Sequence, residues 1–166
     1  MSSKLIVLSG IPGSGKSTYC KYVDATDKRK VIVVSSDEIR KELTGKYANF
    51  SRDKEMWRIL NDKIEFYGSR EKDVIVIVDT TALSNKLRYK YVLNHGGWFD
   101  ERELVVFELP IERCIKQNYN RPQEKWVPEK NIREMKDKLE DVDYKTVYSY
   151  FTSVKIITEE DKYYDN

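Results

Sequence analysis

Short, continuously apolar runs recur along the chain, separated by longer and more polar segments. Four of them consist only of Leu, Ile, Val and Phe, at residues 5–8, 31–34, 74–78 and 104–107, and a weaker fifth covers 154–157. A run without polar alternation is typical of a strand that is buried on both faces, as in a parallel sheet. We therefore predict an α/β fold in which helices flank a five-stranded parallel sheet and ligands bind at the carboxyl ends of the strands.

Two of the intervening segments show the spacing of amphipathic helices. Each follows a serine and repeats apolar residues every three or four positions: Met56, Ile59, Leu60 and Ile64 after Ser51, and Leu87, Tyr91 and Val92 after Ser84. Serine is favoured as a helix N-cap, so we expect helices that begin near these positions. Trp57 and Phe66 share the first segment, and their spacing predicts core positions. No linker or repeat interrupts the alternation, and only the end, EEDKYYDN, reads as loosely held.

The composition is that of one globular domain spanning residues 1–166. Hydrophobic residues make up 40% and charged residues 35% of the chain, which is unlike a disordered segment. Cys20, Cys114 and His95 form no metal-binding pattern, so we interpret them as structural and expect a reducing cytoplasm. No stretch approaches the ~20 apolar residues of a membrane span. The net charge of +2 neither favours nor excludes a nucleic-acid partner.

The stretch GIPGSGKST, residues 10–18, matches the phosphate-binding pattern G-x-x-x-x-G-K-[ST] directly after the first apolar run. In this pattern the backbone N–H groups and a helix N-terminus bind phosphate, the lysine reaches the β and γ phosphates, and the hydroxyl ligates Mg²⁺. We predict a P-loop NTPase fold with ATP and Mg²⁺ as cofactors. The predicted nucleotide contacts are Gly10, Pro12, Gly13, Ser14, Gly15, Lys16, Ser17 and Thr18; the alternative is a plain Gly-Ser turn.

A carboxylate ends the third apolar run, VIVIVDTT. Asp79 lies where an acid would sit beside Ser17 across the sheet, so the two form the predicted Mg²⁺ site. The alternative is an ordinary strand-end carboxylate or helix cap. Thr80 and Thr81 follow, and for each a contact with substrate phosphate and ordinary turn chemistry remain open.

The segment VVSSDEIRKEL, residues 33–43, combines a helix start with a candidate for acid–base chemistry. Ser35 and Glu38 have the spacing of a capping box, and Asp37 and Arg40 fall on one helical face. A carboxylate at this edge of the sheet has the chemistry to accept the proton of an acceptor hydroxyl in a kinase. Arg40 would then bind a phosphate of the acceptor. The alternative is a routine intrahelical ion pair.

Residues 111–140 predict a helix, a break and a second helix that starts at Pro128. Between 112 and 138 there are eight Lys or Arg against five Asp or Glu. A cationic lid, about residues 113–128, would stabilise the transferring phosphoryl group, and we select Arg121 for this role. The alternative is the solvated face of two surface helices.

Other P-loop classes fit less well. Guanine-selective switches carry an N-K-x-D tetrad, whereas residues 85–88 read NKLR. Motor and AAA-type ATPases have longer chains and an acidic pair at the position where threonines follow Asp79. An ATPase or nucleotide-binding module that transfers no phosphate is therefore the second alternative to a kinase.

With these motifs in order, the chain resembles the P-loop kinase domain of the polynucleotide 5′-hydroxyl kinase family, best known from bacteriophages. The resemblance rests on GIPGSGKSTY, SSDEIR, VIVIVDTTALSNKLR and NRPQEKWVP. It implies that Asp37 is the general base, that Arg40 grips the acceptor phosphate, and that Asp79 lies beside Lys16 and magnesium. It also implies that Arg121 contacts ATP and that Trp126 or Val127 stacks on the acceptor base of a DNA or RNA strand.

Two features depart from this family pattern and leave the acceptor open. Gln117 stands where the family often has a second lid arginine, and the lid loop is one residue longer. The same fold serves kinases of hydroxymethylpyrimidines in phage DNA, nucleosides, sugars and antibiotics. These acceptors are the first alternative to a 5′-hydroxyl end.

Overall fold

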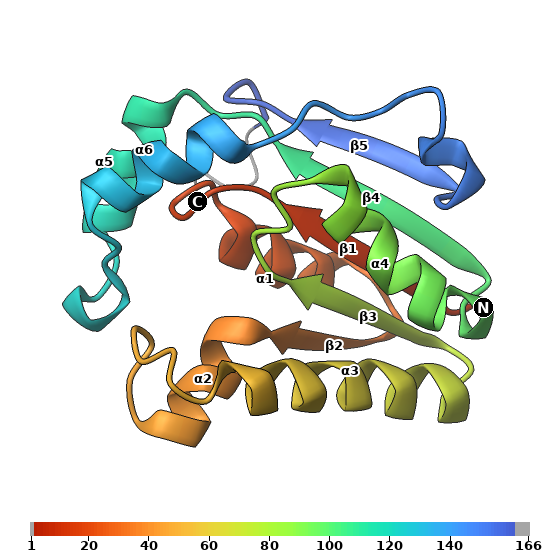
Figure 1. The fold of residues 1–166 in the computed structure, drawn as a ribbon. Coiled ribbons are helices and arrows are strands. Elements are labelled where there is room, and N and C mark those ends of the chain that lie inside the picture. The colour runs from red at the N-terminus through yellow and green to blue at the C-terminus, as the bar shows by residue number, and fades with distance from the viewer. Residues whose placement is uncertain (1, 162–166) are drawn as a thin grey trace.

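The computed structural model describes residues 2–161 (Figure 1). All five predicted strands are present: β1 (Lys4–Ser9), β2 (Lys30–Ser35), β3 (Val74–Asp79), β4 (Glu101–Phe107) and β5 (Ser153–Ile157). They pair in parallel in the order β2-β3-β1-β4-β5. The predicted α/β class with a five-stranded parallel sheet is therefore confirmed, with the P-loop strand at its centre.

Helices cover both faces of this sheet. They are α1 (Lys16–Thr26), α2 (Ser36–Thr44), α3 (Asp53–Arg70), α4 (Asn85–His95), α5 (Ile111–Tyr119) and α6 (Glu129–Lys138), with short 3₁₀ turns η1 (Gly96–Trp98), η2 (Gln123–Lys125) and η3 (Val147–Ser149). Successive strand residues point to opposite faces. The strand side chains on one face of the sheet pack with α3 and α4, and those on the other face pack with α1, α5 and α6.

The carboxyl ends of all five strands point toward the edge where α5, α6 and the loop after α2 lie (Figure 1). The predicted break between helices is the stretch with η2, which connects α5 to α6. This edge therefore brings together the loop after β1, the start of α2, the end of β3 and the predicted lid.

Local capping decides where the helices begin. The Ser84 hydroxyl accepts the Leu87 N–H at 3.1 Å and the Ser35 hydroxyl accepts the Glu38 N–H at 3.3 Å, so both predicted caps are confirmed. The cap predicted at Ser51 is wrong. Its hydroxyl donates to Asn49 Oδ1 at 2.6 Å in the preceding turn, and α3 begins two residues later.

The predicted core positions of α3 are mostly correct. Its buried side chains are Met56, Leu60 and Ile64, and Trp57 packs against this core. Phe66 is instead 47% exposed, where its ring stacks with the Arg70 guanidinium at 4.2 Å. Of the terminal stretch 159–166 that we expected to be loosely held, residues 162–166 lie outside the described chain.

Candidate functional site

The loop after β1 has the form of an anion-binding cradle. Its entry is fixed by the Gly10 N–H, which donates to the Thr81 carbonyl at 2.9 Å. The loop ends at Gly15, which is left-handed (φ 94°) and gives α1 no side-chain cap. An uncapped helix N-terminus presents N–H groups and a positive dipole end. The cradle thus offers phosphate oxygens the donors that the sequence motif predicts.

Lys16 folds back over this loop. Its ammonium donates to the Gly10 and Ile11 carbonyls at 2.9 and 3.0 Å. Burial lowers the pKa of Lys16, whereas the Asp79 and Asp37 carboxylates raise it and Arg121 lowers it. Three of the predicted charged groups, Asp79, Asp37 and Arg121, therefore act electrostatically on Lys16.

Asp79 ends β3 in register with Ser35 of β2. Burial raises the pKa of its carboxyl, Lys16 lowers it, and Asp37 raises it further. A carboxylate destabilised in this way is suited to a cation. Ser17 is exposed, so its hydroxyl is accessible. Together they fit a Mg²⁺ ion that also binds nucleotide phosphates, because magnesium is usually held by one or two carboxylates and the substrate.

Two buried polar atoms of the predicted nucleotide contacts have no hydrogen-bond partner among the described residues. They are Ser14 Oγ in the loop and Arg121 Nε in the lid. Buried polar groups in native proteins are nearly always paired, so unpaired donors of this kind fit the binding of a ligand. The loop and the lid therefore fit a polyphosphate between them. The other predicted loop residues differ in exposure: Gly10 and Pro12 are buried, and Thr18 is partly buried.

The lid is packed directly onto the loop through Gly13. This residue is left-handed (φ 79°), and a Cβ there would lie 2.1 Å from the Cys114 carbonyl oxygen of α5. The Gln117 amide donates to the Gly13 carbonyl at 2.5 Å and accepts from Arg113 Nε at 3.2 Å. Gln117 thus connects the lid to the loop by a hydrogen bond. In the sequence analysis this residue was noted only as a departure from a family pattern. Its place one turn before Arg121 was the available signal.

Arg121 is held in place by other residues of the lid. Its Nη2 donates to Asn118 Oδ1 and, at 2.9 Å, to the Lys125 carbonyl. Burial lowers the pKa of Arg121, and the Asp37 and Asp79 carboxylates raise it. Asn118 is fully buried and also bonds both backbone groups of Val127, at 2.9 and 3.0 Å. This asparagine, near the end of α5, therefore fixes the shape of the lid loop.

The two candidate base-stacking residues have different surroundings. Val127 is partly buried and packs against the core beneath α5 and α6. Trp126 is 42% exposed, donates its indole N–H to the Arg121 carbonyl at 2.8 Å, and meets Tyr119 edge to face at 5.1 Å. Of these two residues, Trp126 therefore offers the accessible aromatic surface. Thr80 is buried beside Asp79.

The predicted face of α2 carries the expected pair. Arg40 Nη1 donates to Asp37 Oδ1 at 2.8 Å, and the Asp37 side chain is 64% exposed. The intrahelical ion pair, which was the alternative interpretation, is thus present. The Asp37 carboxylate is nevertheless exposed, so it is also accessible to an acceptor hydroxyl. Arg40 also bonds Asp53 at the start of α3, a partner that no sequence pattern indicated.

The lid touches α2 through two ion pairs, which we call the lid bridge. Lys41 meets Glu124 at 2.7 Å, and Lys125 meets Glu38 at 3.5 Å. Tyr47 donates its hydroxyl to Glu38 and has both ammonium groups near its ring, at 5.1 and 5.3 Å. The bridge joins α2 to η2 across this edge of the sheet.

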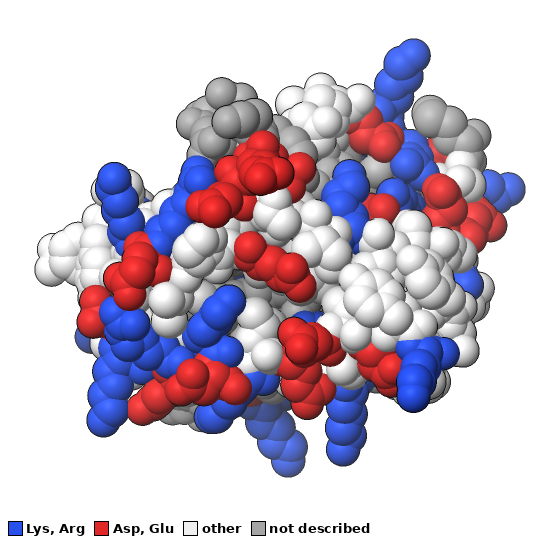
Figure 2. Space-filling view, turned by 90° about the horizontal axis from the view of Figure 1, so that it is seen from above, with Lys and Arg blue, Asp and Glu red and all other residues white. Residues whose placement is uncertain are grey.

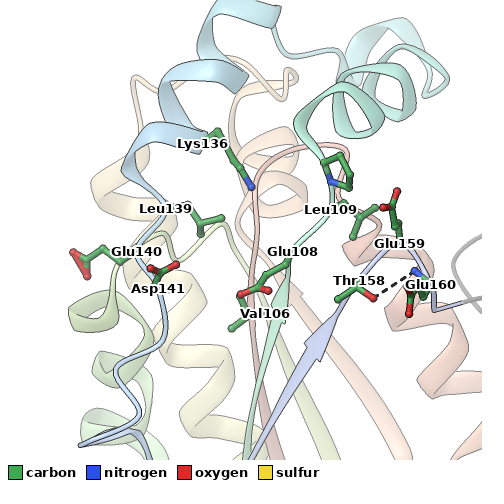
Figure 3. A pocket seen from close by; sticks show the side chains of 11 residues that line it. Val106, Glu108, Leu109, Lys136, Leu139, Glu140, Asp141, Thr158, Glu159 and Glu160 are labelled. Atoms are coloured by element: carbon green, nitrogen blue, oxygen red, sulfur yellow. Dashed lines mark hydrogen bonds between the residues drawn. The ribbon is translucent and has the colours of Figure 1, made fainter.

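A cavity of about 620 Å³ lies elsewhere, at the ends of β4 and β5 beside α6 (Figure 3). Its lining includes Glu108, Lys136, Glu140, Asp141 and Glu159. None of the predicted site residues lines it. Among the described residues no group of three or more His, Cys, Asp or Glu is placed to hold a metal ion, so these carboxylates form no metal site.

Comparison with known proteins agrees with this arrangement. The family model described as AAA domain (AAA_33) matches residues 5–142. The chain belongs to this family. It has a P-loop kinase-like fold. The longer chain and the acidic pair by which the motor and AAA-type ATPases were set aside are therefore not required for membership of this family. The absence of a second acid after Asp79 still separates it from the motor ATPases considered above.

Solved structures with the same fold include several kinases. A chain of a Pnkp1/Rnl/Hen1 RNA repair complex is 23% identical with a TM-score of 0.71, over 83% of this chain and 44% of that one. Kti12 of Chaetomium thermophilum, in complex with ADP-AlF3, is 15% identical with a TM-score of 0.66, over 97% and 95%. A gluconokinase from Sinorhizobium meliloti 1021 is 20% identical with a TM-score of 0.62, over 98% and 86%.

These likenesses establish the AAA-domain fold and leave the acceptor open. The chain spans less than half the length of the RNA repair chain that it matches. No helix in the described part of the chain has the length and apolar character needed to cross a membrane.

Proposed function

We propose that the protein is an Mg²⁺-dependent kinase that transfers the γ-phosphate of ATP to a hydroxyl on nucleic acid, with a 5′-hydroxyl end as first choice. The observation that carries this proposal is the placement of four elements at one edge of the sheet: the loop covered by Lys16, the end of β3 with Asp79, the start of α2 with Asp37, and the segment after α5 with Arg121. Such an arrangement joins a phosphate-binding loop, a metal ligand, a lid cation and an accessible base.

Each group has a distinct task in this proposal. Lys16 and the α1 N-terminus bind the β and γ phosphates, Arg121 binds them from the lid, and Ser17 with Asp79 would hold the metal. When bound, ATP supplies the transferable phosphoryl group and Mg²⁺ neutralises its charge. The chain itself contributes fixed donors, which stabilise developing charge without reorganising.

Asp37 acts as the general base. Its Oδ1 accepts a hydrogen bond from Arg40, while Oδ2 accepts none from the described residues and belongs to a side chain that is 64% exposed. Oδ2 accepts the proton of the acceptor hydroxyl as the oxygen bonds to phosphorus and the bond to the ADP oxygen breaks. Proton transfer to a positioned carboxylate contributes roughly 10²- to 10⁴-fold in rate.

Three features favour a nucleic-acid acceptor. The motifs resemble those of polynucleotide kinases, the fold matches a chain of an RNA repair complex, and Trp126 offers an exposed aromatic surface beside the lid arginine. The gluconokinase likeness keeps small-molecule hydroxyls as the alternative, together with nucleosides and hydroxymethylpyrimidines in DNA. An ATPase that transfers no phosphate is the second alternative.

The decisive assay offers γ-labelled ATP to 5′-hydroxyl oligonucleotides, hydroxymethyluracil-containing DNA, nucleosides and gluconate in parallel. We expect label on the oligonucleotide 5′ end. Label on another acceptor would replace the substrate class, and release of free phosphate without labelled product would replace the kinase by an ATPase.

Asp37→Ala is expected to lower turnover by about 10²-fold or more while ATP affinity changes less than about twofold. The reason is that the carboxylate acts on the acceptor proton and makes no contact with the loop. Glu42→Ala is the matched control, since Glu42 is an exposed carboxylate of the same helix. Turnover of Asp37→Ala close to that of Glu42→Ala would remove Asp37 from the mechanism.

A further inference from the structure

Arg40 is held on three sides. Its Nε and Nη2 donate to the two carboxylate oxygens of Asp53 at 2.8 and 3.0 Å, and its Nη1 donates to Asp37 at 2.8 Å. The Phe50 ring covers the guanidinium at 4.6 Å. Arg40 itself is only 7% exposed. A two-oxygen contact of this kind fixes the plane as well as the position of the guanidinium.

Asp53 is itself on a rigid support. It lies in the first turn of α3, an 18-residue helix whose Met56, Leu60 and Ile64 are fully buried in the core. Groups mounted on a packed helix hold their geometry better than groups on loops. The contact therefore links the core of the protein, through Arg40, to the exposed Asp37 carboxylate.

The charges favour a geometric role for Arg40 over a purely attractive one. One guanidinium is shared by two carboxylates, so its positive charge is already compensated before any acceptor arrives. Three of its five N–H groups are engaged. A compensated cation attracts an acceptor phosphate weakly, but it orients a bound carboxylate well.

We propose that Asp53 is a positioning residue, which holds Arg40 in the one orientation that aims the Asp37 carboxylate at the acceptor hydroxyl. This inference rests on the proposed kinase activity. It assigns a role to a residue thirteen positions from its arginine partner. It also predicts that losing Asp53 slows the chemical step while leaving acceptor binding almost unchanged.

The test compares Asp53→Ala, Asp53→Asn and Asp53→Glu with the matched control Glu55→Ala. Glu55 is the other acidic residue of the same first turn and pairs with Arg52 instead. We expect kcat of Asp53→Ala to fall about tenfold or more, since small misplacements of a catalytic group have effects of this size. The acceptor KM and ATP affinity should stay within about threefold, and Asp53→Glu should recover most of kcat.

A merely structural role predicts a different result. If Asp53 only joined α2 to α3, the variants would lose thermal stability but keep wild-type kcat at temperatures where they are folded. Wild-type kcat in folded Asp53→Asn or Asp53→Ala would overturn the proposal, as would a raised acceptor KM with unchanged kcat. The Arg40→Ala background adds a second check. There, Asp53→Ala should cause no further loss, and additive losses would contradict action through Arg40.

The two proposals fail in distinguishable ways. If the wild-type protein labels no acceptor, the kinase proposal fails and this inference fails with it. If the wild-type protein labels an acceptor and Asp53→Ala matches Glu55→Ala in kcat, only the inference about Asp53 is overturned.

Discussion

At position 13 the chain requires a residue without a side chain for two independent reasons. The backbone is left-handed (φ 79°), which is strained for any residue with a Cβ, and that Cβ would lie 2.1 Å from the Cys114 carbonyl oxygen. Position 13 is a variable position of the motif G-x-x-x-x-G-K-[ST], so the pattern itself requires no glycine there. The second reason arises because α5 packs onto the loop, which only the folded chain brings about.

Gly13→Ala should therefore cost much more than Gly45→Ala. Gly45 has the same left-handed backbone (φ 83°) but nothing within 4 Å of its missing Cβ. We expect about 1 kcal/mol of destabilisation at Gly45 from backbone strain. At Gly13 we expect about 3 kcal/mol or more, because overpacking adds to strain. Urea unfolding measures the free energy of unfolding of both variants. Equal decreases would show that α5 moves away from the added methyl group without further destabilisation.

Elements far apart in the chain meet at the lid bridge between α2 and η2. Lys41 and Glu124 are 83 residues apart, and their side chains are about one-third and one-half exposed. Exposed ion pairs contribute roughly 0.2–1 kcal/mol each. The contact between α2 and η2 is thus weak, which suits the role that we propose for this segment, a lid that admits and releases nucleotide.

Reversing the charges of this pair tests the bridge. Lys41→Glu and Glu124→Lys should each loosen the lid, because each places like charges together, and the double variant should restore the attraction. Hydrogen–deuterium exchange of residues 120–128 reports the opening. We expect about two- to fivefold faster exchange in the single variants and near wild-type exchange in the double variant. Three equally fast variants would mean that the bridge does not hold the lid.

Across the whole molecule the charges nearly balance, at +2. On the face shown in Figure 2 acidic and basic side chains are interspersed, without a broad field of one sign. On this face a polynucleotide would therefore meet a few local cations and not a continuous basic surface. The excess of Lys and Arg between residues 112 and 138 is where such cations concentrate.

Salt dependence separates polymeric from small acceptors. If about three phosphates of a single-stranded oligonucleotide are neutralised on binding, its KM should rise about 20-fold between roughly 50 and 200 mM salt. A nucleoside acceptor releases no condensed counterions, so its KM should hardly change. Steady-state kinetics with both acceptors measures the slopes, and a flat response with the oligonucleotide would argue against phosphate contacts beyond the reacting end.

The sequence by itself determined the sheet, the order of helices and strands, and the phosphate-binding loop. Each of these depends on residues close together in the chain: a run of β-branched residues, a serine before a helix, or a glycine pattern after a strand. Local rules failed where a local competitor intervened, as at Ser51, whose hydroxyl bonds Asn49.

Tertiary structure decided how the candidate site is supported. The contacts of Asp53 with Arg40, Gln117 with Gly13, and Lys41 with Glu124 join residues 13, 104 and 83 positions apart. Such pairs have no periodicity and no fixed spacing, because they depend on which helices the sheet brings to the same edge. The type of side chain determines the chemistry of each group, but the residue that holds the group in position comes into contact with it only in the folded chain.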